Sequence, residues 1–169
     1  MEIVIRRATH LDEEASLTIR YKAWLKAYNH IFGEDNINKF FLNRFADTAY
    51  RQESAKRIDE NPNYYMACDG DTPVAVLIMN LDKENMHNNE VVCFYCHPDY
   101  QRNGIGQKLF DFAKNVFKEN NINYFVVEAL KENFIGNNFY TKHGGKIFKE
   151  FKKEICYTTA DMVVFEFKI

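Results

Sequence analysis

The sequence predicts a single α/β domain over residues 1–169, with a mixed sheet and helices on both sides. A chain of 169 residues suits one domain with a substantial core. Short runs of β-branched and aromatic residues, typical of strands, alternate with segments whose apolar residues recur at helical spacing. The sequence contains no internal repeat, linker or low-complexity segment that would divide this pattern.

The N-terminal third begins with a predicted strand, "EIVIRRAT", and continues into a long helix. Thr9 and Asp12 resemble a helix-starting cap, with Asp in place of the usual Glu or Gln. An amphipathic helix to about His30 is predicted by apolar residues at helical spacing, which are Leu17, Tyr21, Trp24, Leu25 and Tyr28. The stretches "NINKFFLNRF" and "TAYRQESAKRI" predict shorter helices or helical turns.

The remaining strands follow from turn residues and apolar runs. In "NYYMACDGDTPVAVLIMNL" two apolar strands flank Asp-Gly, which suits the positive φ angles of a tight hairpin turn. The strand "VVCFYC" should end or bulge near Pro98, because proline cannot donate a backbone hydrogen bond. "NYFVVEAL" is apolar on both faces, as a central strand is, and "KIFKEF" and "MVVFEFKI" close the chain as strands.

A long amphipathic helix follows the glycine pair Gly104 and Gly106. Its predicted buried stripe consists of Ile105, Leu109, Phe112, Ala113, Val116 and Phe117. A shorter helix is predicted over "IGNNFYTKH". Gly144 can end that helix by supplying a left-handed residue.

Charge and hydropathy argue against several classes of protein. The formal net charge is −2, which does not favour general nucleic-acid binding, although a local basic patch stays open. The first residues carry charges and lack an apolar signal core. No apolar stretch approaches the length of a membrane span. The sequence therefore predicts a cytoplasmic protein.

Cys93 and Cys96 form a CxxC pair within the strand-like "EVVCFYCHP". Residues three apart on a strand point to opposite faces, so these two sulfurs cannot easily share a metal ion or a disulfide. No second cysteine pair completes a zinc set. We expect buried free thiols and no metal site.

The glycines in "QRNGIGQ" have two readings. Glycine at a strand-to-helix junction lets backbone amides approach a ligand, and the first helical turn has unpaired N–H groups that bind phosphate. Alternatively, the glycines serve only a sharp turn. A dinucleotide fingerprint is excluded because Leu109 occupies the place of its third glycine, and a Walker Gly-Lys-Ser/Thr ending is missing.

Two blocks of the sequence resemble motifs of the GNAT superfamily, the acetyl-CoA-dependent N-acetyltransferases. "HPDYQRNGIGQKLFDFA" has the form Gln/Arg-x-x-Gly-x-Gly/Ala after a strand, at Gln101, Gly104 and Gly106. "ENFIGNNFYTKHGG" is similar to the family's Asn…Phe-Tyr-x-x-x-Gly segment and stands at the right distance. The order of predicted elements also follows the family from end to end. The resemblance implies a GNAT-like fold, whose central sheet is mixed, mostly antiparallel and of about seven strands.

The resemblance also implies which residues hold acetyl-CoA as cosubstrate. The backbone of Phe94, Tyr95 and Cys96 would hydrogen-bond the pantetheine arm. The glycine motif and its loop, whose amides would hold the pyrophosphate, comprise Gln101, Arg102, Asn103, Gly104, Ile105, Gly106 and Gln107. Asn133 matches an asparagine that contacts the cofactor further along. Tyr140 matches a tyrosine at the cofactor that often protonates the leaving thiolate.

Acetyl transfer to an amine needs proton acceptors and donors. For Tyr140, the alternative to an acid role is a buried hydroxyl bonded to the structure. Glu128 matches a base in some relatives and Glu90 a position commonly acidic in similar sequences, and either carboxylate can take a proton directly or through water. His97 has a suitable intrinsic pKa but equally suits a loop. An interruption of strand pairing would free a backbone amide around Cys96 to bind an oxyanion.

The resemblance also bears on three features outside the cofactor site: the residue at position 145, metal binding and the oligomeric state. Gly145 departs from the family, which usually has a bulky apolar residue, commonly Phe, after the first glycine, so local packing there should differ. No metal is implied. The resemblance is compatible with a homodimer, but the sequence does not give the oligomeric state.

The sequence does not identify the acceptor. Trp24, Tyr28 and Phe32 lie in a region that shapes the acceptor pocket in the family, but their spacing also suits a helix facing the core. Small amines, polyamines, amino acids, antibiotics and protein N-termini stay open. Two functions follow: transfer of the acetyl group to a primary amine by direct attack in a ternary complex, or a non-catalytic sensor that binds CoA or acyl-CoA. Intact Tyr140 and Asn133 favour the enzyme, and transfer of a longer acyl group is a third alternative.

Overall fold

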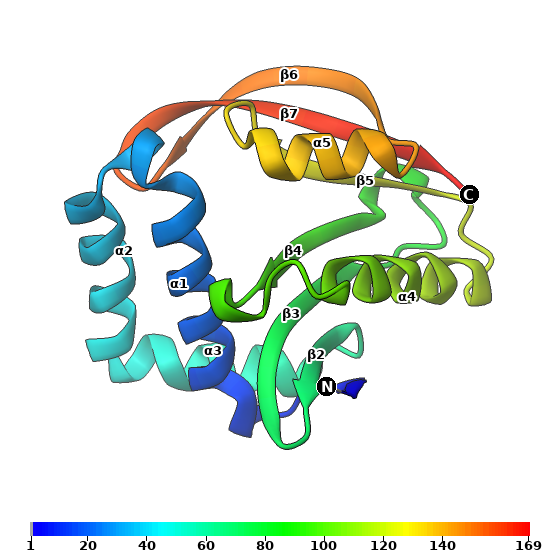
Figure 1. Cartoon of the computed structure of the whole chain (residues 1–169). Helices are drawn as coiled ribbons and strands as arrows, with labels where there is room; N and C mark the ends of the chain where they lie inside the picture. The colour runs from blue at the N-terminus through cyan, green and yellow to red at the C-terminus, as the bar shows by residue number, and fades with distance from the viewer. Residues whose placement is uncertain (1) are drawn as a thin grey trace. The chain divides into compact units, whose positions relative to one another are not determined.

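A computed structural model describes residues 2–169 and confirms the predicted α/β fold (Figure 1). Seven strands form one mixed sheet in the order β1-β2-β3-β4-β5-β7-β6. The pairs β1–β2, β2–β3, β5–β7 and β6–β7 are antiparallel, whereas β4 and β5 are parallel. The sheet is therefore mixed and mostly antiparallel, as the sequence predicts.

The chain divides into two compact units, which we describe separately. Unit 1 comprises Met1–Ile78 and Cys93–Phe112, and unit 2 comprises Met79–Val92 and Ala113–Ile169. The elements of unit 1 are β1 (Ile3–Arg7), η1 (His10–Asp12), α1 (Glu13–Phe32), α2 (Glu34–Ala46), α3 (Thr48–Glu60), β2 (Tyr64–Asp69) and η3 (Pro98–Tyr100). Those of unit 2 are η2 (Met86–Asn88), β5 (Tyr124–Leu130), α5 (Phe134–Lys142), β6 (Lys146–Ile155) and β7 (Thr158–Lys168). The elements β3 (Thr72–Asn80), β4 (Glu90–Cys96) and α4 (Ile105–Glu119) contribute residues to both units.

The predicted cap at Thr9 and Asp12 opens η1, the short turn that leads into α1. Asp12 Oδ2 accepts a hydrogen bond from the Thr9 amide at 2.9 Å. Arg6 donates to both carboxylate oxygens of Asp12, at 2.8 and 2.7 Å. Burial opposes the ionised form of Asp12, but these bonds outweigh it and lower the pKa of the carboxyl. At the other end, α1 runs to Phe32, two residues past the prediction.

Helices α1, α2 and α3 lie beside one another in unit 1 (Figure 1). A cluster of buried residues in this unit is contributed by α1, α3, the strands β2, β3 and β4, and the residue that follows β1. Its members are Ala8, Ile19, Ile58, Tyr64, Met66, Cys68, Val76 and Cys93. The cluster explains why helical segments with weak amphipathic patterns, such as α3, still fold, because tertiary packing outweighs intrinsic propensity.

Two neighbouring residues of β4 show that helices cover both faces of this strand. The Tyr95 ring lies against Tyr28 of α1, with ring centroids 6.4 Å apart. The Phe94 ring lies against Phe110 of α4, at 5.8 Å. Successive side chains of a strand point to opposite faces, so α1 and α4 flank β4 from opposite sides.

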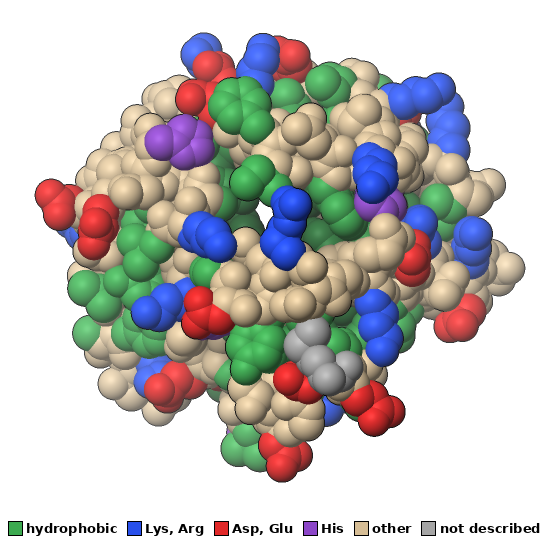
Figure 2. Space-filling view, in the orientation of Figure 1, with side chains coloured by type: hydrophobic (Ala, Val, Ile, Leu, Met, Phe, Trp, Pro, Cys, Tyr) green, Lys and Arg blue, Asp and Glu red, His purple; other side chains and the backbone are tan. Residues whose placement is uncertain are grey.

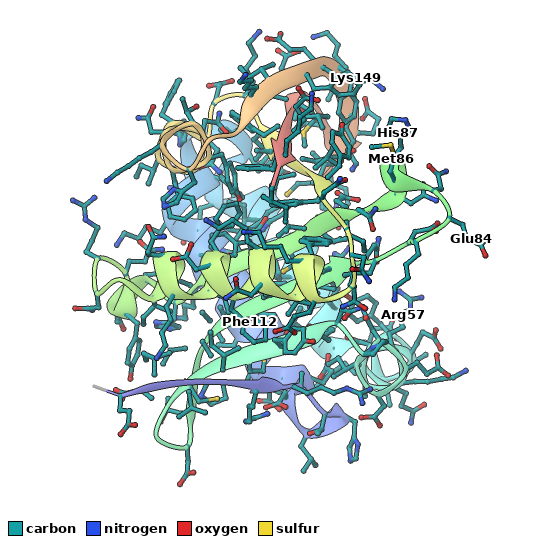
Figure 3. All side chains as sticks on the ribbon, turned by 90° about the vertical axis from the view of Figure 1, so that its right-hand side faces the viewer. Arg57, Glu84, Met86, His87, Phe112 and Lys149 are labelled. Atoms are coloured by element: carbon teal, nitrogen blue, oxygen red, sulfur yellow. The ribbon has the colours of Figure 1, made fainter. Side chains whose placement is uncertain are left out.

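The buried stripe of α4 differs from the prediction at one turn. Ile105, Leu109, Ala113, Val116 and Phe117 are buried as predicted. Phe112 is only half-buried and points from α4 toward β2, where its ring contacts Tyr65 at 4.8 Å (Figure 3). Phe110, outside the predicted stripe, is fully buried. A helix that packs on a sheet buries a wider face than the narrow stripe read from the sequence.

In unit 2, stacked phenylalanine rings connect α4, β5 and β7. Phe117 and Phe125 stack at 4.5 Å, and Phe125 and Phe167 at 4.8 Å, with nearly parallel ring planes. Strand β6 lies at the edge of the sheet and extends to Ile155, beyond the predicted "KIFKEF". Nearly all its side chains are exposed, so the apolar signal of a strand is missing from its second half.

The described surface carries charges of both signs. On the face shown in Figure 2, acidic and basic side chains are interspersed, with apolar side chains between them. Within residues 2–169, no helix is long and apolar enough to cross a membrane. The same residues contain no group of three or more His, Cys, Asp or Glu side chains arranged to hold a metal ion.

Candidate active site

The loop between β4 and α4 contains one left-handed glycine of the pair Gly104 and Gly106. Gly104 adopts φ +75°, in the left-handed region where a side chain is strained, and Arg102 precedes it at φ +69°. The Lys108 amide donates to Gly104 O at 3.0 Å, which closes the first turn of α4. The amides of Ile105 and Gly106 belong to that first turn and therefore have no partner within the helix.

This loop fits a diphosphate group. A Cβ built on Gly104 would meet no atom within 4 Å, so the space beside the loop is open. In general, the amides of a first helical turn and the partial positive charge of a helix N-terminus bind phosphate where such a space exists. The Arg102 side chain is exposed and adds a positive charge. The residues present thus match the needs of the phosphate end of coenzyme A.

Two predicted binding residues use their side chains to shape this loop. Gln101 Nε2 donates to Cys96 O at 3.2 Å, which ties the loop to the end of β4. Asn103 Nδ2 donates to Tyr100 O and Gln101 O, at 3.2 and 3.3 Å. The Gln101 amide also donates within the loop, to Pro98 O at 3.3 Å, so both residues shape the loop through hydrogen bonds of their own.

His97 has a local structural role. Its Nδ1 accepts a hydrogen bond from the Asp99 amide at 3.3 Å and caps η3. The His97 amide donates to Val74 O of β3 at 2.8 Å. These bonds agree with the reading of His97 as a loop histidine.

Strand β4, which carries Phe94, Tyr95 and Cys96, pairs little with β5. The parallel register joins Glu90 to Val126, and the Val126 amide donates to Asn89 O at 2.9 Å. No other register position of this pair occurs in residues 2–169. Within the described residues, β4 therefore has one register pair with β5, at Glu90. A peptide-like ligand needs an unpaired strand edge.

The cysteines of the CxxC pair are free thiols, like the other two cysteines. Burial raises the pKa of both the Cys93 and the Cys96 thiol to about 11. Both are therefore protonated near neutral pH, and a thiol in that state is a poor nucleophile.

Trp24, Tyr28 and Phe32 form part of an aromatic cluster between α1 and α2. Their exposed fractions are 7%, 5% and 4%. The Trp24 ring stacks on Phe32 at 5.6 Å and on Phe40 at 5.3 Å. These contacts support the core-facing alternative for the three residues in unit 1.

In unit 2, Asn133 and Tyr140 lie at the two ends of α5. Asn133 caps the helix, since its Oδ1 accepts a hydrogen bond from the Gly136 amide at 3.2 Å. Tyr140 is buried, and its ring lies 5.4 Å from Phe165 and 6.4 Å from Phe167 of β7. Seven residues separate Asn133 and Tyr140, so both side chains lie on one face of the helix.

Two carboxylates and a lysine form an electrostatic group in unit 2. Glu90 is half-buried; burial, and then the charge of Glu128, raise the pKa of its carboxyl. Lys153 acts in the opposite direction and lowers it. Lys153 Nζ also donates to Glu128 Oε2 at 2.7 Å. A carboxylate with a raised pKa is a stronger proton acceptor near neutral pH than an ordinary one.

A comparison with models of known protein families shows which family the chain belongs to. The family model described as "Acetyltransferase (GNAT) family" matches residues 22–145, which is most of the chain. The chain belongs to the acetyltransferase (GNAT) family.

Relatives of this GNAT chain share its fold at low sequence identity. A spermidine N(1)-acetyltransferase from Thermoplasma acidophilum is 22% identical over 148 residues, covering 87% of this chain and 90% of the relative. The crystal structure of PaiA N-acetyltransferase from the same organism, in complex with coenzyme A, is 20% identical, with a TM-score of 0.82 over 100% of both chains. A GCN5-related N-acetyltransferase structure from Rhodopseudomonas palustris is 14% identical, with a TM-score of 0.76 over 100% of this chain and 97% of the other.

The GNAT motif residues fall into two sets. Unit 1 brings together the end of β4 and the glycine loop, residues 94–107, and unit 2 holds Glu90, Glu128, Asn133 and Tyr140. Sequence reasoning missed Lys153, whose place beside Glu128 depends on the register of β6. It also missed Phe167, which fills the space beside Gly145, the position where this GNAT chain departs from its family.

Proposed function

We propose that this GNAT protein is an N-acetyltransferase that moves the acetyl group of acetyl-CoA to a primary amine. The observation that carries the proposal is that β4 pairs with β5 at Glu90 alone within the described residues and continues through η3 into the glycine loop at α4. Together β4 and the loop supply hydrogen bonds for a peptide-like arm and amides for a diphosphate, in the order in which coenzyme A presents these groups. When bound, acetyl-CoA supplies the acetyl group as a thioester.

The chain's first task is to hold two reactants together. The amides of Ile105 and Gly106, the α4 N-terminus and Arg102 bind the phosphates in this proposal. The backbone of Phe94, Tyr95 and Cys96 holds the pantetheine arm. Fixing a thioester beside an amine supplies a large part of the rate enhancement, because the step becomes effectively unimolecular.

Glu90 is our proposed proton acceptor for the incoming ammonium group, acting directly or through water. Its raised pKa, caused by burial and by Glu128, supports this role. Glu128 itself accepts a hydrogen bond from Lys153 Nζ at 2.7 Å, so its carboxylate is already engaged. Glu128 then serves mainly to set the electrostatic surroundings of Glu90.

Tyr140 is our proposed acid for the leaving thiolate. Its burial against Phe165 and Phe167 fixes the ring, and a phenol has a proton to give at neutral pH. A fixed donor avoids the cost of ordering water at the moment of transfer.

The first acceptor to test is spermidine, because a relative that covers most of the chain acts on it. We also infer a cytoplasmic setting, where the four cysteines stay reduced. A homodimer is compatible with the family resemblance.

The test is thiol release from acetyl-CoA with a panel of polyamines, amino acids and peptide N-termini, beside coenzyme A binding by calorimetry. We expect binding together with amine-dependent release. Binding without release from any amine would favour the sensor that holds CoA without turnover. A chain that does not bind coenzyme A would overturn the proposal.

A further inference from the structure

Neighbouring atoms leave no room for a side chain at Gly145, whereas its backbone conformation does not require glycine. The preceding Gly144 ends α5 with φ +91°, a conformation that favours glycine. Gly145 does not share that conformation, so an L-residue could adopt its backbone without strain. A Cβ on Gly145, however, would lie 2.7 Å from Cζ of Phe167 and 2.9 Å from the backbone oxygen of Tyr140. Real Cβ atoms do not approach other atoms so closely, so any side chain at 145 must displace one of these groups.

The Phe167 ring has little freedom to give way. On β7 it stacks on Phe125 of the paired strand β5 at 4.8 Å, and the two residues are register partners. Phe125 in turn stacks on Phe117 at 4.5 Å. Phe167 is 2% exposed. An atom added at Gly145 therefore pushes on a ring that is held from the other side.

The groups around Gly145 all contact Tyr140. The Gly145 amide donates to Tyr140 O at 2.9 Å and closes the end of α5. The Phe167 ring meets the Tyr140 ring nearly at right angles, with centroids 6.4 Å apart. Phe165, two residues earlier on the same face of β7, lies 5.4 Å from it. Displacement of Phe167 or of the helix end would turn or shift the tyrosine ring.

We propose that Gly145 and Phe167 act together as positioning residues for Tyr140: the missing side chain at 145 admits the Phe167 ring, and the ring fixes the phenol. The proposal rests on the acid role of Tyr140 given above. It explains why a bulky residue is absent at 145, since the ring from β7 already occupies that space.

Gly145→Ala is the central variant. We expect its kcat to fall at least about tenfold, because small misplacements of a reacting group are costly, while KM for acetyl-CoA changes little. Gly144→Ala is the matched control: it introduces backbone strain at the same helix end, but its Cβ would meet no atom within 4 Å. It should lose thermal stability without the same loss of kcat.

Background variants separate positioning from general damage. Phe167→Leu should itself lower kcat, because the ring that fixes the phenol is lost, and adding Gly145→Ala to it should lower kcat little further, because the smaller side chain leaves room for the new methyl group. In a Tyr140→Phe background, Gly145→Ala should lower kcat little further, since the group it displaces no longer acts. An equal fall in the wild-type and Tyr140→Phe backgrounds would overturn the proposal, and so would unchanged kcat in Gly145→Ala alone. Full activity of Tyr140→Phe would instead remove the acid role on which the proposal rests.

A measurement without turnover tests the same contact. In protein with 13C-labelled tyrosine, the Tyr140 ring signal is assigned by its loss in Tyr140→Phe. Gly145→Ala should shift this signal, and the double variant with Phe167→Leu should match Phe167→Leu alone. A Tyr140 signal that stays in place in Gly145→Ala contradicts the inference whatever the acceptor is.

Discussion

Lys153 on β6 reaches Glu128 on β5 across the intervening strand β7, with Nζ 2.7 Å from Oε2. Both side chains keep partial contact with solvent, at 47% and 32% exposure, so the pair adds little to stability. Its electrostatic consequence is larger than its contribution to folding. Glu128 raises the pKa of Glu90, whereas Lys153 lowers it, so the two charges of the pair act on this pKa in opposite directions.

Lys153→Met tests this balance through the pH dependence of the reaction. Without the lysine, the pKa of Glu90 moves further upward, since burial and Glu128 are then opposed less. The acid limb of the kcat/KM profile should shift to higher pH. Lys152→Met is the control, because Lys152 pairs with Asp161 at 2.9 Å instead. A profile that shifts equally in both variants would argue against Glu90 as the proton acceptor.

Glu90→Gln should weaken catalysis and stabilise the fold. The pKa of Glu90 is raised in the folded protein above its ordinary value of 4.5. The contribution of Glu90 to stability is therefore fully present below that ordinary value and is lost as pH rises through the folded pKa. Glutamine avoids this loss.

The expected result for Glu90→Gln is a higher melting temperature than wild type at pH 7.5, with the difference vanishing near pH 4. Thermal unfolding at the two pH values measures it. A variant that is less stable than wild type at pH 7.5 would show that Glu90 is stabilised by ionisation, against the direction argued here.

Local sequence signals predicted those parts of the fold that short-range chemistry decides. Asp-Gly predicted the hairpin turn, in which Gly70 adopts φ +58°, and the glycine pair marked the strand-to-helix junction, where Gly104 adopts φ +75°. Both conformations depend on a few neighbouring atoms. Apolar runs between turn residues likewise predicted a segment of each of the seven strands that the structure describes.

Contacts between segments that are distant in the chain could not be predicted from the sequence. Phe167 meets Gly145 only because β7 and the end of α5 pack together, 22 positions apart in the chain. Lys153 meets Glu128 through a β6 register that shifts between Ile147 and Lys149, and an exposed edge strand gives no apolar pattern from which to read that register. The family resemblance supplied the roles of Asn133 and Tyr140, while the cap made by Asn133 emerged from the structure.

Tyr140→Phe keeps the ring and removes the phenolic proton. The contacts with Phe165 and Phe167 are ring contacts, so the fold should remain and coenzyme A binding should change little. We expect kcat to fall by about 100-fold, the usual size of a general-acid contribution. Steady-state kinetics with the best acceptor measure it, beside calorimetry for coenzyme A. Unchanged kcat would take Tyr140 out of the mechanism.

Gly104→Val tests the loop that the whole proposal needs. A β-branched residue at φ +75° is strained by about 1–3 kcal/mol, and the loop relieves this by moving its amides. The space beside Gly104 is open, so the valine does not clash and the fold should stand. We expect the Kd for coenzyme A to rise by roughly tenfold or more, since 1.4 kcal/mol is a tenfold change.

Gly70→Val is the matched control for Gly104→Val. Gly70 also has a positive φ, +58°, and also has no atom within 4 Å of an added Cβ, but it lies in the β2–β3 turn of the same unit. It should lower thermal stability by a similar amount and leave the Kd for coenzyme A unchanged. Calorimetry on the two variants then compares how similar backbone strain at two places affects the Kd for coenzyme A. Equal affinity of both variants for coenzyme A would mean that the amides at the start of α4 do not hold the diphosphate.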